Sequence, residues 1–521
     1  MSENKNPRPS KVEAAAETAD LYFRTDHLKA DLGRRTARGG AVVLGSQGFK
    51  FAVNMAATVV LARLVTPQDY GLIGMVLVLT GFVALFKSLG LSAATVQRAE
   101  ITAQQVSTLF WVNVAASLVL MLLTVALAPA VALFYHEPRL TWVTIAFAAG
   151  FLFSGLVVQH EALMKRQMRF LPLAVAEIVS LAAGLAVAIV WAWRGAGYWA
   201  LVANQLVSGS VYALCIWVAC GWRPGPPVRN SGVRSMLAFG GSLTGFAFFN
   251  YFSRTLDNLL IGRVWGAQQL GLYAKAYQLL LLPIDQLSSP LDGVALPALS
   301  RLVDEPERYR HAYLRILEKI AMFSMPGVAL MIGTSDWLVQ VMLGPQWGET
   351  ARIFALLGVV GLVEPVSNTM GWLLISQART RHLVQWGIID GALSIVSILA
   401  GLPWGAVGVA ASFGVVGLCV RKQLLIIFTG RTGPVRAADI YRTLAPSACA
   451  ALGVLAALYA FRRWADVTRP LAGLLAGFVI AAGVALLFFL ILPRGRRALR
   501  EMRELLPALV KTRKAASSSG C

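Results

Sequence analysis

The sequence has few charged residues and no long polar segment. Charged residues make up 14% of its 521 residues and hydrophobic residues 57%, whereas a typical soluble domain is about 25% charged. Apolar stretches of about twenty residues, enough to cross a ~30 Å hydrocarbon layer, recur from Gly40 to Leu492. The sequence therefore excludes a separate soluble domain and predicts an all-α polytopic membrane protein of about fourteen transmembrane helices.

Motifs for metals, disulfides and nucleotides are also lacking. The five cysteines form no CxxC pair, and the five histidines are scattered without a ligand pair. The sequence contains no GxxxxGK[ST] nucleotide loop, no HExxH motif and no GxSxG motif. We therefore expect no cofactor, no metal and no ATP hydrolysis by this chain, and we expect that it is not an enzyme.

The net charge of +21 comes from basic residues in short loops and at both ends. This placement is typical of the excess of Lys and Arg on the cytoplasmic side of membranes, so we expect no nucleic-acid partner. An even number of helices with both termini in the cytoplasm accounts for the imbalance between the loops. The first 39 residues have no apolar core or cleavage site of a signal peptide.

A polar, proline-containing segment divides the apolar stretches into two groups of six. The expected segments are a cytoplasmic tail (1–39), an N-lobe of helices 1–6 (40–220), a cytoplasmic linker (221–235), a C-lobe of helices 7–12 (236–430), helices 13 and 14 (431–492) and a basic cytoplasmic tail (493–521). The basic tail is either a solvated helix or one that lies on the anionic inner leaflet.

Single helices within the C-lobe have their own expected bounds. Helices 7 and 8 are expected over 236–261 and 271–296, helix 10 over 351–375 and helix 12 over 405–420. Three prolines at or just beyond helix 8, Pro283, Pro290 and Pro297, predict that this helix is bent or broken.

The two lobes share residues at an offset of 200 positions. The matching residues are Gly40, Gly45, Phe49, Arg63, Gln68, Gly71 and Leu72 with Gly240, Gly245, Phe249, Arg263, Gln268, Gly271 and Leu272. Six helices separate the copies, so both have the same orientation, as in a parallel repeat. Such repeats place the substrate site between them near the bilayer midplane, here between helices 1–2 and 7–8.

Cations and amides in these helices are candidates for binding an anionic head group. A charge at the bilayer centre costs at least ~2.5–3.5 kcal/mol, so charges there must face a wet cavity or a partner. Lys50 and Asn54 lie on one stripe of helix 1, and their counterparts in the repeat are Asn250 and Arg254. Lys87 in helix 2 completes the expected substrate-binding set.

The same charges also allow a structural interpretation. Arg254 can pair with Asp257 one turn away, as an ion pair inside the bundle. Lys50 has no acid within one turn of its own helix, so pairing within the helix does not account for it. Asp257 and Glu364 are the candidates for carrying a coupling ion.

Several longer motifs carry a resemblance to a known family. They are LARLVTPQDYGLIGM (Leu61–Met75), SLGLSAATVQR (Ser88–Arg98), STLFWVN (Ser107–Asn113), GYWALVANQL (Gly197–Leu206), LDNLLIGRVWGAQQLGLYAKAY (Leu256–Tyr277) and QLSSPLDGVALPALSRL (Gln286–Leu302). With these motifs the chain resembles the Wzx-type polysaccharide flippases of the MOP superfamily, in the exopolysaccharide, colanic-acid-like branch.

The resemblance implies two six-helix lobes around a cleft, two extra C-terminal helices and alternating access. It implies transport of undecaprenyl-pyrophosphate-linked oligosaccharide from the cytoplasmic to the periplasmic leaflet of a bacterial inner membrane, for exopolysaccharide, capsule or O-antigen assembly. Membrane lipids, a polysaccharide polymerase and export machinery are the implied partners. Lys50, Lys87 and Arg254 have the same charge as the arginines in the cleft of the lipid II flippases, although their exact positions are not carried over.

Two other functions fit parts of the sequence. A MATE-like antiporter of cationic drugs has the same fold, but such a protein prefers a pocket dominated by acids. A polytopic polysaccharide polymerase or ligase needs a sizeable extracytoplasmic loop, and the predicted loops on that side are short. A purely structural membrane protein gives no reason for repeated charges in mid-bilayer.

Overall fold

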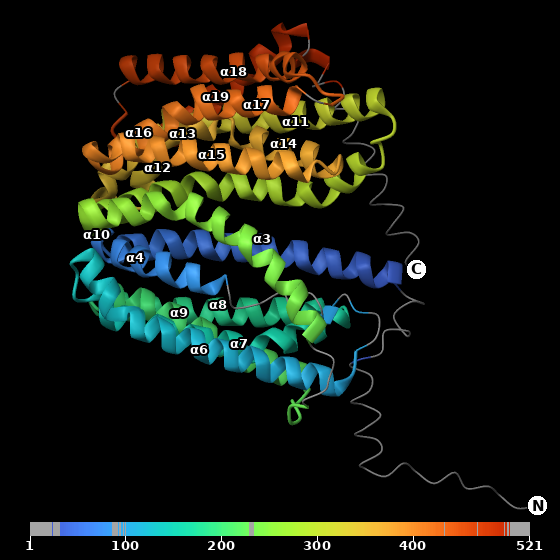
Figure 1. Ribbon diagram of the computed structural model, residues 1–521. Coiled ribbons are helices and arrows are strands. Elements are labelled where there is room, and N and C mark those ends of the chain that lie inside the picture. The colour runs from blue at the N-terminus through green and yellow to red at the C-terminus, as the bar shows by residue number, and fades with distance from the viewer. Residues whose placement is uncertain are drawn as a thin grey trace, which may run out of the picture. The chain divides into compact units, whose positions relative to one another are not determined.

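The computed structural model describes residues 23, 32–85, 92, 95, 96, 98, 101–228, 234–431, 433–465, 467–493, 495–497 and 500. The regular elements of this described part are helices (Figure 1). Ten candidate spans among the described residues are long and apolar enough to cross a membrane. The prediction of an all-α polytopic membrane protein is confirmed, and the total of fourteen helices stays a prediction.

The chain forms two compact units, residues 1–268 and 269–521. The first unit contains α3 (Leu32–Leu64), α4 (Pro67–Ala84), α6 (Ala103–Tyr135), α7 (Leu140–Arg166), α8 (Phe170–Trp193), α9 (Tyr198–Cys220) and the first part of α10 (Arg234–Ser300). Within this unit α6 packs along α7, and α8 packs along α9. In Figure 1, α6, α7, α8 and α9 run in nearly the same direction, and the first part of α10 runs obliquely to them.

Local signals set the ends of helices in the first unit. The Thr66 side chain accepts a hydrogen bond from the backbone N–H of Asp69, whose carboxylate bonds back to Thr66, before α4. Thr102 and Gln105 form the same capping box before α6. Each box satisfies backbone donors that the first helical turn leaves free. The starts of α4 and α6 are therefore well defined.

The second unit begins with the remainder of α10. Its elements are α11 (Pro306–Gly333), α12 (Ser335–Met342), η1 (Pro345–Trp347), α13 (Gly348–Gly361), α14 (Glu364–Ser376), α15 (Thr380–Gly401), η2 (Leu402–Trp404), α16 (Gly405–Val416), η3 (Gly417–Arg421), α17 (Lys422–Gly430), α18 (Ala437–Trp464) and α19 (Pro470–Ile491). Its core is built around α11, where Tyr309, Tyr313 and Leu317 are fully buried.

The break within α10 lies at a glycine and not at the prolines. The backbone stays helical through Pro283, Pro290 and Pro297, so a break at these positions is excluded, and a bend there stays a prediction. A proline removes one backbone donor and crowds the carbonyl four residues earlier, but membrane helices tolerate it where neighbouring groups satisfy the freed backbone. Gly266 instead has φ 80°, a left-handed conformation that only glycine adopts without strain.

The position of this break matches the predicted repeat. Gly266 lies 200 residues after Thr66, where α3 gives way to α4. Both copies therefore consist of two helices that meet at an equivalent position. Gly71 of the first copy lies against the backbone of Ala267, where an added Cβ would come within 1.6 Å of the carbonyl oxygen. Only a glycine at position 71 allows α4 to approach α10 this closely.

Two predicted helices of the C-lobe have different bounds in the structure. The helix expected over 351–375 is interrupted at Leu362 and Val363, just before Pro365, and continues as α14. Pro365 has no backbone N–H to continue the preceding helix, and proline is well suited to the first turn of a helix, so a new helix begins at Glu364. The helix expected to end at Val420 instead passes through the π-helical turn η3 and continues as α17.

Candidate functional site

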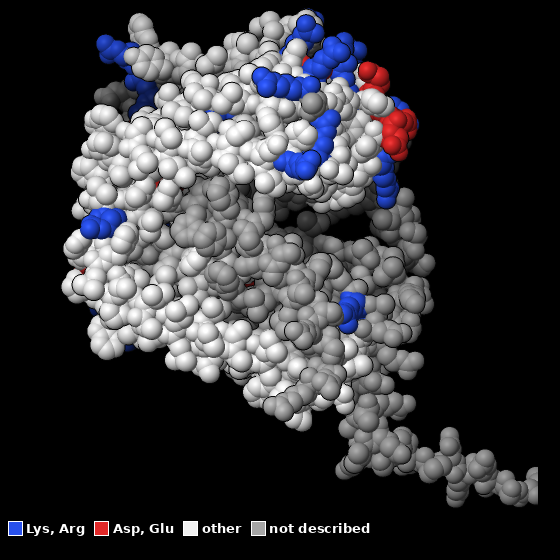
Figure 2. Space-filling view, viewed as in Figure 1, with Lys and Arg blue, Asp and Glu red and all other residues white. Residues whose placement is uncertain are grey.

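The visible surface in Figure 2 is mostly uncharged over the described residues, and the Lys and Arg seen there lie mostly toward the ends of helices. Charges between these ends are exceptional, because each costs free energy in hydrocarbon. Two groups of charged side chains nevertheless lie within the helices, one group in each unit.

In the first unit, Lys50 of α3 pairs with Glu177 of α8. The ammonium donates to the Glu177 carboxylate, and the two side chains are 18% and 40% exposed. The pair is thus reachable from outside the protein core. Asn54 follows Lys50 by one turn of α3 and is exposed. A cation and an amide are therefore presented on one helix, with the cation held by an acid 127 positions away in the chain.

A second acid lies near Glu177 on the neighbouring helices. Glu161 of α7 accepts a hydrogen bond from the Tyr212 hydroxyl at 2.8 Å and from the Lys165 ammonium at 2.9 Å. Glu177 also acts electrostatically on Tyr212. The first unit therefore has polar groups from α3, α7, α8 and α9 in one region. Sequence analysis missed Glu161 because its partner Tyr212 lies on another helix.

In the second unit, four charged side chains from α14, α15, η3 and α17 form two ion pairs. Arg421 donates two hydrogen bonds to the Asp390 carboxylate, from Nε to Oδ1 at 2.9 Å and from Nη2 to Oδ2 at 2.8 Å. Lys422 holds Glu364 at 2.8 Å. Arg421 and Lys422 are nearly buried, at 7% and 9% exposure, and the two acids are about 30% exposed. The charges of Arg421 and Asp390, as well as that of Lys422, act on Glu364.

Local structure brings these four groups together. The interruption before Pro365 places Glu364 in the first turn of α14, where a helix dipole favours negative charge. The π-helical turn η3 shifts the register of the chain so that Arg421 and Lys422 both lie inward. Such turns recur at functional sites. Sequence analysis placed Arg421 and Lys422 in a loop and therefore missed them.

The other predicted site residues have different outcomes. Asp257 is buried at 6% exposure, and its Oδ1 accepts a hydrogen bond from the backbone N–H of Asn258 at 2.7 Å. Asn250 and Arg254 lie in α10, but their side chains are outside the described residues, as is all of Lys87. The expected meeting of Lys50 with Arg254 therefore stays a prediction.

The chain is similar in sequence to known proteins of polysaccharide biosynthesis. Residues 60–352 match the family described as "Polysaccharide biosynthesis protein". The chain is 26% identical over 361 residues to the lipopolysaccharide biosynthesis protein WzxC of Escherichia coli (strain K12), covering 68% of this chain and 73% of that protein. It is 24% identical over 381 residues to the succinoglycan biosynthesis transport protein ExoT of Rhizobium meliloti (strain 1021), covering 69% and 75%.

A solved structure has the same fold. The lipid II flippase MurJ in its inward closed conformation superposes with a TM-score of 0.68 at 13% identity, covering 85% of this chain and 96% of that one. The resemblance expected from the sequence motifs is thereby confirmed. The chain is a multi-pass membrane protein that belongs to the family of polysaccharide biosynthesis proteins.

Proposed function

We propose that this protein is a flippase for undecaprenyl-pyrophosphate-linked oligosaccharide repeat units. It moves them from the cytoplasmic to the periplasmic leaflet of a bacterial inner membrane by alternating access, and both of its termini are cytoplasmic. The repeat units supply exopolysaccharide, capsule or O-antigen assembly, together with a polymerase and export machinery. The observation that carries this proposal is the family match over residues 60–352, and the fold shared with MurJ supports it.

Lys50 and Asn54 are proposed to bind the pyrophosphate of the substrate. Lys50 already binds a carboxylate, Glu177, that is 40% exposed, so a phosphate oxygen can replace a carboxylate oxygen without leaving the ammonium unpaired. Asn54 can donate from its amide one turn away. Asn250, Arg254 and Lys87 complete the proposed set on the basis of the repeat.

The membrane potential favours this direction of transport. A pyrophosphate diester carries about two negative charges, and each charge moved outward gains ~2.3 kcal/mol per 100 mV. The acids in the second unit offer a route for additional coupling. Protonation of Glu364 would release Lys422, and we propose that Glu364 carries the coupling proton, with Asp257 as the corresponding acid of α10.

The experiment is a leaflet assay in cells that lack this protein. We expect completed lipid-linked units to accumulate in the cytoplasmic leaflet, protected from an impermeant glycosidase in intact spheroplasts and digested in inverted vesicles. Complementation with the full chain should restore digestion in spheroplasts. If the deletion leaves the units equally accessible from outside, the protein is not their flippase.

A separate variant tests the proposal that Glu364 carries the coupling proton. Glu364→Gln removes the titrating proton but keeps the size of the side chain, so transport in proteoliposomes should lose its dependence on a pH gradient. Glu349→Gln, on the exposed first turn of α13, is the matched control and should keep that dependence. An unchanged pH-gradient response of Glu364→Gln would remove Glu364 from the coupling mechanism.

A further inference from the structure

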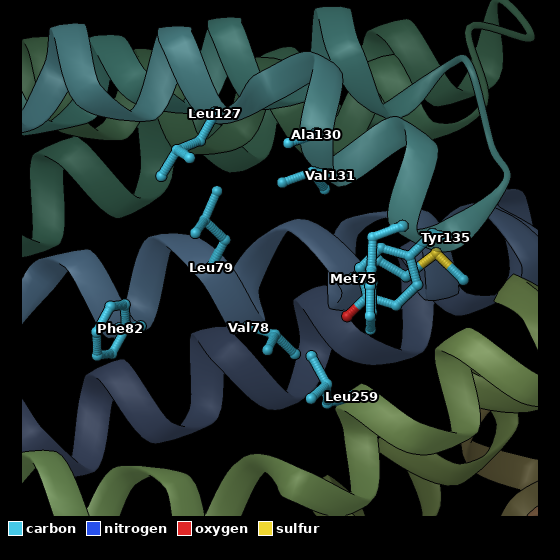
Figure 3. A pocket seen from close by; sticks show the side chains of 10 residues that line it. Met75, Val78, Leu79, Phe82, Leu127, Ala130, Val131, Tyr135 and Leu259 are labelled. Atoms are coloured by element: carbon cyan, nitrogen blue, oxygen red, sulfur yellow. The ribbon is translucent and has the colours of Figure 1, made fainter.

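The first unit contains an apolar cavity that no step of the proposed transport uses. It has a volume of about 310 Å³ and is lined by α4, α6 and α10, with Val78, Phe82, Leu127, Val131 and Leu259 among its walls (Figure 3). An engineered cavity of about 150 Å³ admits benzene, so a space about twice as large holds a chain segment of about ten to twelve carbons. Its size fits part of one lipid chain.

One polar group interrupts the apolar lining. Tyr135, the last residue of α6, is 7% exposed, and among the described residues its hydroxyl has no hydrogen-bond partner. In Figure 3 this hydroxyl points from α6 into the space beside Val78 and Leu259. A buried hydroxyl without a partner is costly. An occupant that brings an oxygen acceptor to this point would remove the cost, and a bare hydrocarbon would not.

A cation lies at the same end of the cavity. The Arg263 guanidinium of α10 is 5.6 Å from the centre of the Phe134 ring. Phe134 also lines the cavity and is 43% exposed, and its ring meets that of Tyr135 edge to face at 4.9 Å. From the outside inward, the site therefore has the Arg263 guanidinium, the Phe134 ring and the buried Tyr135 hydroxyl. This order suits a head group, an ester and a hydrocarbon chain.

We propose that this cavity binds one acyl chain of an anionic phospholipid from the surrounding bilayer. An acyl ester oxygen accepts the hydrogen bond from Tyr135, and the lipid phosphate lies beside Arg263. Basic pockets between membrane helices on the cytoplasmic side bind anionic head groups, and the same attraction between a cation and a phosphate operates at Arg263. A polyisoprenoid chain has no ester oxygen, which is why a glycerophospholipid fits the Tyr135 hydroxyl better than the carrier lipid does. Binding of this lipid does not depend on which substrate is transported.

The test is native mass spectrometry of the full chain with phosphatidylglycerol, with phosphatidylethanolamine of the same acyl chains and with undecaprenyl phosphate. The wild type should retain one phosphatidylglycerol in preference to phosphatidylethanolamine. Tyr135→Phe should weaken this binding about fivefold, as expected for one hydrogen bond. Arg263→Gln should abolish the preference for the anionic head group.

Two tryptophan variants separate the cavity from the general surface. Ala130 lines the cavity and is exposed, so Ala130→Trp should fill the space and remove the bound lipid. Ala126, one turn earlier on α6, is exposed and is not part of the lining, so Ala126→Trp should bind like the wild type. Both variants should elute as single species in gel filtration.

Three results would overturn the proposal. Equal retention of both phospholipids would show that Arg263 does not select a charge. Wild-type binding by Ala130→Trp would show that the chain lies elsewhere. Displacement of phosphatidylglycerol by equimolar undecaprenyl phosphate, with no effect of Tyr135→Phe, would assign the cavity to the carrier lipid instead.

Discussion

Individual charges in this protein are stabilised by partners that lie far away in the sequence. Lys50 pairs with Glu177 across α3 and α8, and Arg421 pairs with Asp390 across η3 and α15. The two pairs differ in exposure. The Lys50 pair is partly open, which suits exchange of partners with a substrate, whereas Arg421 is 7% exposed, which suits a permanent structural role.

The first prediction concerns Lys50. Lys50→Ala should lower polysaccharide export about tenfold, as expected from the loss of a charge-assisted hydrogen bond to the substrate. Glu177→Gln should keep most export, because it releases the cation without removing it. Export is measured per amount of protein in the membrane. Equal losses in both variants would mean that the ion pair is structural and that Lys50 does not bind substrate.

The second prediction concerns the buried pair. Asp390→Ala leaves the Arg421 guanidinium in the core without its carboxylate, so it should lower the free energy of unfolding by about 3 kcal/mol. The double variant Asp390→Leu with Arg421→Met should recover much of this loss. Thermal unfolding in detergent gives the comparison. Additive losses in the double variant would contradict a direct interaction between the two side chains.

The third prediction concerns pH and the loop between α6 and α7. Arg139 donates to Glu137 at 2.7 and 2.9 Å, and these hydrogen bonds hold the pKa of the Glu137 carboxyl below its usual range. Because the folded pKa is lowered, the stabilisation is present above the pKa of the unfolded chain and is lost as pH falls through the folded value. The stability difference between wild type and Glu137→Gln should therefore vanish at acid pH, as measured by thermal unfolding.

Among the elements, close packing of α4 against the first part of α10 depends on small residues. Gly71 lies against Ala267, and Gly81 lies against the Tyr251 hydroxyl, which donates to the Val78 carbonyl at 2.8 Å. These contacts hold the beginning and the end of α4. They also explain why the first unit extends to Gln268, whereas the sequence predicts lobes divided by residues 221–235. The division of transport between two lobes stays a prediction.

The fourth prediction tests this packing. Gly71→Leu places a side chain where the Ala267 carbonyl lies, so it should lower the free energy of unfolding by about 3 kcal/mol through overpacking. Gly45→Ala on α3 is the control, because nothing lies within 4 Å of its added Cβ. That variant should be neutral or more stable by up to about 1 kcal/mol. Similar unfolding temperatures for both variants would contradict the contact between α4 and α10.

For the whole molecule, the proposed function requires a defined orientation in the membrane. With the amino terminus in the cytoplasm, the turn between α6 and α7 faces the periplasm and the end of α7 faces the cytoplasm. In a variant whose own cysteines are replaced by serine, Pro138→Cys should react with an impermeant maleimide in intact spheroplasts. Lys165→Cys should react only after permeabilisation. The opposite pattern would contradict the proposed orientation, with both termini in the cytoplasm.

Much of the architecture was predictable from the sequence because it follows from local properties. Apolar stretches long enough to cross a bilayer make helices the only stable choice, and the capping residues Thr66 and Thr102 mark where two of them begin. The repeat predicted a junction near position 266, and Gly266 provides it. The family also followed from contiguous motifs, which need no knowledge of packing.

The pairing of side chains was decided only by the tertiary structure. Helices in a membrane are apolar on nearly all sides, so hydrophobic periodicity does not reveal which face of α3 meets α8 or which face of α15 meets η3. Glu177 as the partner of Lys50, Lys422 as the partner of Glu364, and the cavity beside Tyr135 all depend on these faces. The sequence determined which charges enter the membrane, and packing between distant helices determined what each of them contacts.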